Sequence, residues 1–345
     1  MLGTYTSDFR AAKAEAAVDY LALICLNADL PGQLGRAQAT TCHEALTELV
    51  LETREFAQLL GDIRSSDGQR IPGYIEQRIR VIKVADQRTF LKSITVQAAS
   101  VADDSGRIAD AVLLYHLAEE YDNVVAILNR TLSEALAVDL GQESMRIEPL
   151  RPRQPQPQPG QQGQQQQQQT PQDPNSSLSL TSVDDPALLA RNFIRLYESN
   201  GLYFSKIRPE NREVALLLLK INAVKTAIAA QRWDEALDAV VSTNLLPINA
   251  GGSLPAIRAA AQNFNQADTV LSKCIPNLLV WTILACGRQR EHFLQGGFEQ
   301  RTREERAERY LGVARDLMVF AGLVRFRLPP RVSEMLARVG QDVGV

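Results

Sequence analysis

Apolar residues recur with a helical period in three stretches of the chain. One stretch, from Val214 to Ile228, follows Pro209, a residue that fits the first turn of a helix, and it predicts one long helix. Asp185 followed by Pro186 predicts a second helix start, because Asp is a favoured cap and Pro a favoured first residue. Residues 307–321 repeat the pattern near the end of the chain. The apolar positions concerned are Leu189, Phe193, Leu196, Tyr197, Val214, Leu217, Leu218, Ile221, Val224, Ala227, Ile228, Ala307, Tyr310, Leu311, Ala314, Leu317, Met318 and Ala321.

Strand signals are nearly absent from the same sequence. The β-branched clusters are short, and the dipeptide Asp67-Gly68 is the one turn signal that could join two strands. Its flanks do not alternate between apolar and polar residues. The pattern therefore predicts an all-α protein.

A short motif occurs twice. Ala118–Val125 and Ala230–Leu237 share the order Ala, two polar residues, an aromatic residue, Asp, a polar residue and an apolar pair. In each case we expect the aromatic residue to wedge between two antiparallel helices and the Asp to cap the second helix. Stacked hairpins of this kind form an α-solenoid, and two copies without a regular period indicate an irregular one.

The composition changes abruptly between Pro149 and Ser179. This stretch holds seven of the sixteen prolines, and residues 154–172 carry no charge and no large apolar side chain. Such a segment cannot bury enough surface to offset its ordering entropy, so it is predicted to be disordered. It is either a linker between two independent domains or a loop inserted in one continuous structure, since loop-closure entropy grows slowly with length.

Composition and charge restrict the class of protein. The 345 residues, 45% of them apolar and 22% charged, suffice for one large or two ordinary globular units. Residues 1–150 contain 14 basic and 22 acidic side chains, a net −8, whereas the rest contain 23 and 18, a net +5. The basic residues of the second half alternate with acidic ones, so no stripe suited to a phosphate backbone forms, and nucleic-acid binding is not expected.

Cysteine usage and apolar run lengths favour an intracellular protein without a transmembrane segment. The longest uncharged apolar run, Cys274–Gly287, is well short of the roughly 20 residues that a bilayer requires. No secretory or mitochondrial signal is evident at the N-terminus. The cysteines lie far apart without a CxxC pair and are predicted to be reduced and mostly buried. They are Cys25, Cys42, Cys274 and Cys286.

Motifs that carry common enzyme chemistry are missing from the sequence. There is no Gly-Lys dipeptide for a P-loop, no Gly-x-Ser-x-Gly and no Gly-x-Gly-x-x-Gly. His43 lacks a second His at metal-ligand spacing and is expected on a helix surface or partly buried. His116 is expected as a hydrogen-bonded residue between packed helices, and His292 as a surface or capping residue near a helix end.

Acidic pairs and aromatic residues also favour structural roles. Asp103-Asp104 and Asp184-Asp185 are each interpreted as caps and dipole partners just before a helix. Tyr121 and Trp233 are expected in the core and not as ligand-stacking residues. The sequence therefore predicts no catalytic, cofactor-binding or metal-binding residue, and it does not say which residues bind partners.

Several strings resemble fungal members of the nucleoporin-interacting component family, the inner-ring scaffold proteins of the nuclear pore complex. The similarity covers most of both halves, in particular the C-terminal portion of the family, and omits the Gln/Pro-rich stretch. The strings are Leu60–Arg64, Gly73–Arg78, Gly106–Ala118, Tyr121–Asp122, Ser133–Ala135, Ala314–Val324 and Arg327–Pro329.

The resemblance implies a non-enzymatic scaffold nucleoporin of the nuclear envelope that binds other inner-ring nucleoporins and supports transport of protein and mRNA. It also implies that the family solenoid docks a linear motif of a membrane-associated linker nucleoporin. Family members are longer, and their N-terminal partner motifs are expected to be absent from this chain, which begins near the middle of the family pattern as a fragment or a truncated gene model would.

The resemblance favours one solenoid over two independent domains. We therefore expect a first solenoid part at residues 1–148, a disordered insertion at 149–180 and a C-terminal solenoid part at 181–345, continuous with the first. The alternative is a helical-repeat adaptor of another assembly, such as a vesicle coat or a proteasome-lid-like complex. An enzyme is the third and weakest class.

Overall fold

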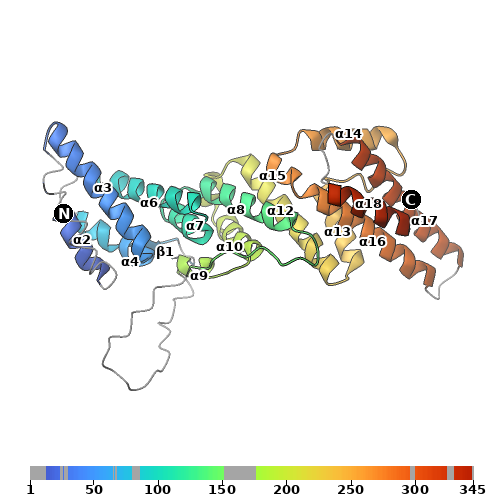
Figure 1. Ribbon diagram of the computed structural model, residues 1–345, viewed down its shortest axis with the longest axis horizontal. Helices are drawn as coiled ribbons and strands as arrows, with labels where there is room; N and C mark the ends of the chain where they lie inside the picture. The colour runs from blue at the N-terminus through green and yellow to red at the C-terminus, as the bar shows by residue number, and fades with distance from the viewer. Residues whose placement is uncertain are drawn as a thin grey trace, which may run out of the picture. The chain divides into compact units, whose positions relative to one another are not determined.

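A computed structural model describes residues 13–23, 26, 30–64, 66, 68–79, 86–150, 176–295, 300–324 and 330–343. The chain forms two compact units, each built from two separate stretches. Unit 1 contains residues 1–127 and 146–207, and unit 2 contains residues 128–145 and 208–345. Figure 1 labels the helices and strands. Most of the Gln/Pro-rich insertion, residues 151–175, lies outside the described residues, and the continuity of the two solenoid parts stays a prediction.

Unit 1 consists of helices that pack as successive neighbours along the chain, α2 on α3, α3 on α6 and α6 on α7. The short helix α9 packs on both α7 and α10. The elements are α2 (Ala14–Ala22), α3 (Gln33–Thr53), α4 (Phe56–Leu60), β1 (Gly61–Ile63), β2 (Arg70–Pro72), α5 (Tyr74–Ile79), α6 (Gln87–Asp104), α7 (Ile108–Leu117), the first part of α8 (Tyr121–Ala137), α9 (Ser177–Thr181), α10 (Pro186–Ser199) and α11 (Gly201–Ser205).

Unit 2 is organised around one central helix, α16, which contacts α12, α13, α17 and α18. Its elements are the last part of α8, α12 (Pro209–Ala229), α13 (Trp233–Thr243), α14 (Leu254–Asn265), α15 (Thr269–Ser272), α16 (Ile275–Gln295), α17 (Gln300–Leu323) and α18 (Pro330–Val343). The helices stack as hairpins, so the prediction of an all-α, irregular α-solenoid is confirmed.

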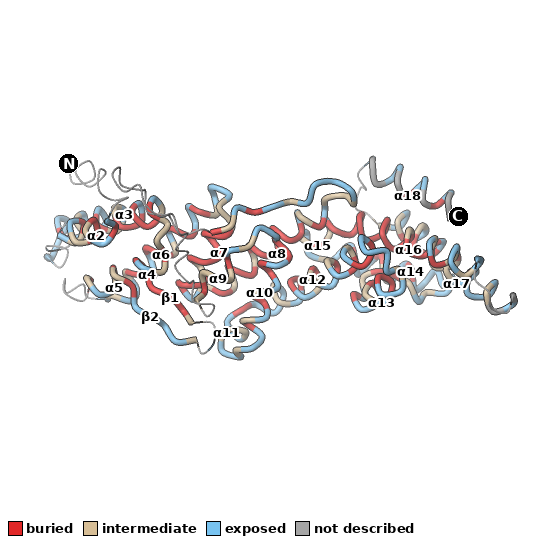
Figure 2. The backbone as a smooth tube through the Cα atoms, turned by 90° about the horizontal axis from the view of Figure 1, so that it is seen from below, coloured by how far each residue is buried: buried red, intermediate tan, exposed pale blue. Residues whose placement is uncertain are grey.

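The predicted helix starts and apolar stripes are also confirmed. Asp185 caps α10 by accepting a hydrogen bond from the backbone N–H of Ala187 at 2.9 Å, and Pro209 is the first residue of α12. The inner positions of α12 are buried at every predicted residue except Leu217, which is half-buried. Figure 2 shows buried and exposed positions alternating along the helices. Local sequence periodicity therefore places these helices correctly.

The apolar run Cys274–Gly287 becomes the core of unit 2. Residues 275–283 of α16 are all buried, and Trp281 among them is one of the largest fully buried side chains. A helix surrounded by neighbours is apolar on all sides, which explains the run. Within the described ranges, no helix is both long and apolar enough to span a bilayer.

The two copies of the repeated motif form the same turn. After α7, the N–H of Glu119 bonds to the carbonyl of His116 at 3.0 Å and that of Glu120 to Tyr115 at 2.9 Å. After α12, Gln231 bonds to Ile228 at 3.0 Å and Arg232 to Ala227 at 2.8 Å. This is the Schellman helix end, in which the residue after the cap is left-handed.

A third copy of this turn, which the sequence comparison missed, joins α6 to α7. Gly106 bonds to Asp103 and Arg107 to Ala102, both at 2.9 Å. The left-handed residues of the three turns are Gly106 at φ +72°, Glu119 at +60° and Gln231 at +57°. Two of the three are not glycine, so the turn carries no common sequence signal.

Three predictions about the turns and acidic pairs are wrong. Asp122 and Asp234 do not cap the following helices but lie within their first turns, where their charges still favour the helix dipole. Asp103-Asp104 forms the end of α6, and the residue at the N-cap of the next helix, α7, is Arg107. Tyr121 is buried as expected, whereas Trp233 is only half-buried.

The dipeptide Asp67-Gly68 lies between two short strands in the sequence, although its flanks do not alternate between apolar and polar residues. β1 and β2 pair antiparallel with Gly61 opposite Pro72, Asp62 opposite Ile71 and Ile63 opposite Arg70. Gly68 has φ +70°, and Asp67 lies outside the described residues. Strands of three residues are too short to show an alternating pattern, so periodicity cannot reveal them.

Candidate interaction site in unit 1

The three histidines differ in burial and in partners. His43 is half-buried, its Nε2 lies 2.9 Å from Ser93 Oγ, and burial lowers the pKa of its imidazole. His292 is exposed in the last turn of α16. His116 is fully buried between helices with its Nδ1 3.1 Å from the Tyr197 hydroxyl, as the sequence predicts.

Cysteine chemistry differs from the prediction at one position. Cys42 is disulfide-bonded, so the expectation of four reduced cysteines is wrong for this residue; Cys25 lies outside the described residues. Spacing along the chain does not say which thiols meet in space, which is why the sequence misses it. Cys274 and Cys286 are free and buried, and burial raises the pKa of their thiols to about 11 and about 12.

The described residues contain no cluster of three or more His, Cys, Asp or Glu side chains that could hold a metal ion. The polar contacts that are concentrated in unit 1 instead join segments that are distant in sequence.

An ion pair whose acidic partner is buried joins the end of α3 to α7. Arg54, the residue after α3, has φ +57° and donates through its second guanidinium nitrogen to Asp110 Oδ1 at 2.7 Å. Asp110 is 1% exposed, and Arg107 lies 3.5 Å from its other oxygen. Burial raises the pKa of the Asp110 carboxyl, and the hydrogen bond and charge of Arg54 oppose that rise.

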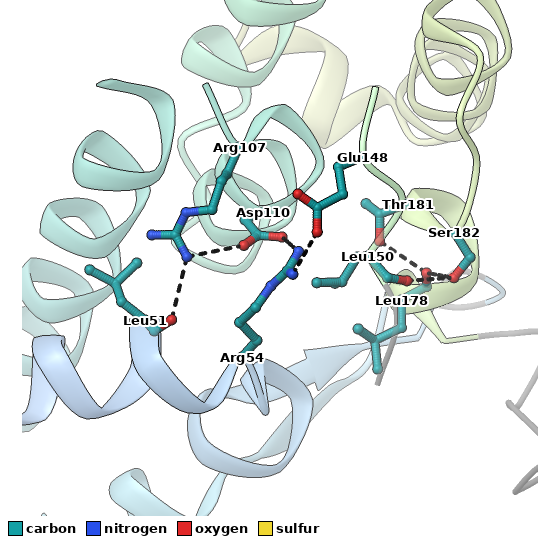
Figure 3. Close-up of polar contacts among 9 residues, drawn as sticks. All are labelled: Leu51, Arg54, Arg107, Asp110, Glu148, Leu150, Leu178, Thr181 and Ser182. Carbon is teal, nitrogen blue, oxygen red and sulfur yellow. Dashed lines mark hydrogen bonds and ion pairs between the residues drawn. The ribbon is translucent and has the colours of Figure 1, made fainter. Parts of the chain in front are cut away.

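The same guanidinium reaches a third segment (Figure 3). Its other terminal nitrogen donates to Glu148 Oε1 at 3.0 Å. Glu148 lies in residues 146–150, which we call the strap and which have no helical or strand structure. The first strap residue, Arg146, forms an ion pair with Asp184 at 3.0 Å. One arginine therefore fixes α3, α7 and the strap together.

Backbone bonds and two apolar anchors complete the attachment of the strap. The N–H of Ile147 donates to the Asp184 carbonyl at 2.9 Å, and the N–H of Leu150 donates to the Thr181 carbonyl at 3.2 Å. Ser182 Oγ donates back to the Leu150 carbonyl at 3.3 Å (Figure 3). Ile147 is 6% and Leu150 2% exposed. We call the receiving groups, Arg54, Thr181, Ser182 and Asp184, the seat.

A second carboxylate anchors the chain beyond the strap. Asp62 of β1 accepts hydrogen bonds from Ser176 Oγ at 2.5 Å, from the Ser177 N–H at 3.2 Å and from Ser177 Oγ. These donors begin α9, so the negative charge lies where a helix N-terminus favours it. Both sides of residues 151–175 are thus bound to unit 1.

Unit 1 also contains an aromatic cluster, formed by side chains of α7, α8 and α10. His116 packs on Tyr121, Phe193 and Tyr197, with ring centroids 5.5 to 5.8 Å apart. Burial lowers the pKa of the His116 imidazole to about 4, although the charges of Asp62 and Glu119 oppose this change. Burial also raises the pKa of the Tyr121 hydroxyl well above its ordinary value. The imidazole is neutral at physiological pH, so it serves packing between α7 and α10.

Comparison with known proteins identifies the chain's family. The sequence profile of Nup93/Nic96 matches residues 1–335. Nucleoporin NIC96 of Chaetomium thermophilum is 45% identical over 344 residues, 99% of this chain and 30% of the relative. Nucleoporin NIC96 of Saccharomyces cerevisiae is 37% identical over 341 residues, 98% of this chain and 36% of the relative. The chain therefore spans about a third of the length of these relatives.

The solved structures agree with the sequence comparison. The crystal structure of Chaetomium thermophilum Nic96 SOL aligns with a TM-score of 0.83 at 45% identity, covering 98% of this chain and 46% of the other. Sequence and fold thus match over nearly the whole chain. The protein belongs to the Nup93/Nic96 family.

Proposed function

We propose that this chain is a structural, non-enzymatic part of the nuclear pore complex at the nuclear envelope. Its support is the family match over residues 1–335 together with the relatives' name, nucleoporin. The helical hairpins supply extended lateral surface for partners, which suits a scaffold. Since the chain covers only part of its relatives, this role is carried over from proteins of about three times its length.

The finer proposal is a place in the inner ring. There the chain binds other nucleoporins, including a linear motif of a membrane-associated linker nucleoporin, and supports transport of protein and mRNA. Grooves between stacked helices are the expected binding surfaces, with apolar anchors inserted where hairpins meet. The segments 1–148 and 181–345 act in this proposal as one solenoid. Within unit 1, the ring contacts of His116 in α7 with Phe193 and Tyr197 in α10 support it.

A chimera tests the role. The 341 matched residues of Saccharomyces cerevisiae NIC96 are replaced by this chain, and the tagged product is imaged and pulled down with inner-ring linker nucleoporins. We expect a nuclear rim signal and recovery of the linker proteins. The matched control carries Phe193→Asp, which places a charge in the buried aromatic cluster and should abolish both. Cytoplasmic puncta from a folded chimera would contradict the proposal and favour an adaptor of another assembly.

A further inference from the structure

The strap binds its seat with groups that any extended peptide possesses. Two of its backbone N–H groups and one carbonyl meet the chain at residues 181–184, and its side chains add one basic, one acidic and two apolar contacts. Pro149, the strap residue without an N–H, lies between Ile147 and Leu150, whose N–H groups donate these bonds. Domains that recognise extended peptides use backbone hydrogen bonds for affinity and side-chain contacts for specificity, and the strap makes both kinds of contact.

The seat is held in place by contacts that do not involve the strap. Arg54 is fixed by Asp110 at 2.7 Å and by its own N–H, which bonds to the Val50 carbonyl at 3.1 Å. Thr181 donates from its hydroxyl to Leu178 at 3.0 Å within α9. Asp184 precedes the capped start of α10. None of these contacts involves a strap residue, so we expect the receiving groups to keep their positions when the strap leaves.

The strap, by contrast, adds little structure of its own. Residues 143–150 form no helix or strand, and only Ile147 and Leu150 are buried among the five strap residues. The strap side chains that form the two ion pairs are exposed: the exposed fraction is 72% for Arg146 and 67% for Glu148. Segments with few buried apolar contacts open locally before the unit that holds them unfolds.

We propose that the seat is a groove for an extended peptide, which the strap fills in cis and which a partner segment of the same pattern fills in trans. The pattern is basic, apolar, acidic, any residue, apolar. Charge complementarity fixes it: Asp184 receives the basic residue, Arg54 the acidic one. The inference rests on the proposed scaffold function for its biological use, but its test needs only the isolated chain.

Hydrogen–deuterium exchange of the wild-type chain tests whether the strap opens. We expect the amides of Ile147 and Leu150 to exchange at least tenfold faster than those of Val112 and Leu113, which are buried in α7. Equal protection would mean that the strap leaves only when unit 1 unfolds, and the proposal would be overturned. This measurement requires no variant.

Peptide binding tests the groove itself. The probe is a fluorescent peptide of residues 143–150, Glu-Ser-Met-Arg-Ile-Glu-Pro-Leu. In the variant Ile147→Ser/Leu150→Ser the strap loses both anchors, so we expect the peptide to bind it at least tenfold more tightly than the wild-type chain. The matched control is Leu202→Ser, an apolar side chain 75% exposed elsewhere in unit 1, which should behave as wild type.

A charge exchange then locates the peptide. In the strap-weakened chain, Asp184→Lys should weaken binding of the native peptide severalfold, and a peptide carrying Arg146→Glu should restore it. Failure of the peptide to bind the folded strap-weakened chain, equal binding to all three chains, or indifference to the charge exchange each overturns the proposal. Concentration-dependent dimers without peptide would mean that a second copy's strap fills the groove, and would overturn the assignment to a partner segment. Failure of any arm leaves nuclear rim localisation untouched, so the two proposals fail separately.

Discussion

At the scale of single residues, burial decides how a histidine titrates and packs. The three histidines have the same chemistry in the sequence, yet one is exposed, one half-buried and one fully enclosed by aromatic rings. The sequence predicts the burial of His116 because apolar residues surround it along the helix. It cannot predict the partner Tyr197, which is 81 residues away.

Protonation of His116 should destabilise unit 1 in acid. The unfolded imidazole takes up a proton below its ordinary pKa near 6.5, whereas the folded one resists until about 4. The unfolded state therefore binds more protons in this window, so stability rises with pH from about 4 to 6.5 and is lost as pH falls. At pH 5 the loss is about 2 kcal/mol, from roughly 1.4 kcal/mol per pKa unit.

Urea unfolding at pH 7.5 and pH 5.0 measures this effect. In His116→Asn, whose side chain does not titrate but can still accept from the Tyr197 hydroxyl, the difference between the two pH values should shrink by about 2 kcal/mol. The exposed His292→Asn serves as the control and should keep the wild-type difference. An unchanged pH dependence in His116→Asn would show that other groups cause the acid sensitivity.

Helices, at the scale of elements, follow from local sequence, whereas their connections do not. α10 and α12 are predictable because capping residues and a 3.6-residue period are properties of neighbouring positions. The β1–β2 pair, the strap and the link from Arg54 to Asp110 depend on segments brought together by folding, and no local pattern encodes them. The sequence therefore does not predict the candidate site, because Arg54 and Glu148 are ordinary charged residues that lie 94 positions apart.

The three Schellman turns allow a paired test of backbone conformation. Gly106 and Gln231 occupy equivalent left-handed positions, one with and one without a side chain. Gly106→Ala should destabilise unit 1 by about 1 kcal/mol, because a Cβ is disfavoured in this conformation although nothing lies within 4 Å of it. Gln231→Gly should stabilise unit 2 by about 0.5 kcal/mol, the same steric relief reduced by the greater freedom of unfolded glycine.

Chemical denaturation of the two variants measures these changes. The exposed substitution Gln262→Ala in α14 provides a helix-surface reference that should change stability little. Shifts of the same sign in Gly106→Ala and Gln231→Gly would be inconsistent with equivalent turns. Opposite signs would establish the third copy of the repeat that the sequence comparison did not detect.

Each unit, at the scale of the whole molecule, combines stretches that are separated along the chain, so noncovalent contacts and not chain continuity define it. The charge difference between the halves, −8 against +5, therefore does not map onto the two units. In unit 1 the segments on both sides of residues 151–175 are bound to the rest of the unit. On one side the strap binds residues 181–184, and on the other side the start of α9 donates hydrogen bonds to Asp62.

Residues 151–175 should therefore be replaceable by a short linker. Leu150 bonds to Thr181, and α9 is a single turn of five residues back to Ser177, so the two attachment points lie about 10 Å apart. Six Gly and Ser residues span up to about 20 Å. Because a shorter loop costs less entropy to close, the free energy of unfolding should stay equal or rise by about 1 kcal/mol. The same replacement in the Ile147→Ser variant should unfold at a lower denaturant concentration, since one of its attachment points is weakened. If the linker replacement in the wild-type background abolished cooperative unfolding, residues 151–175 themselves would hold unit 1 together.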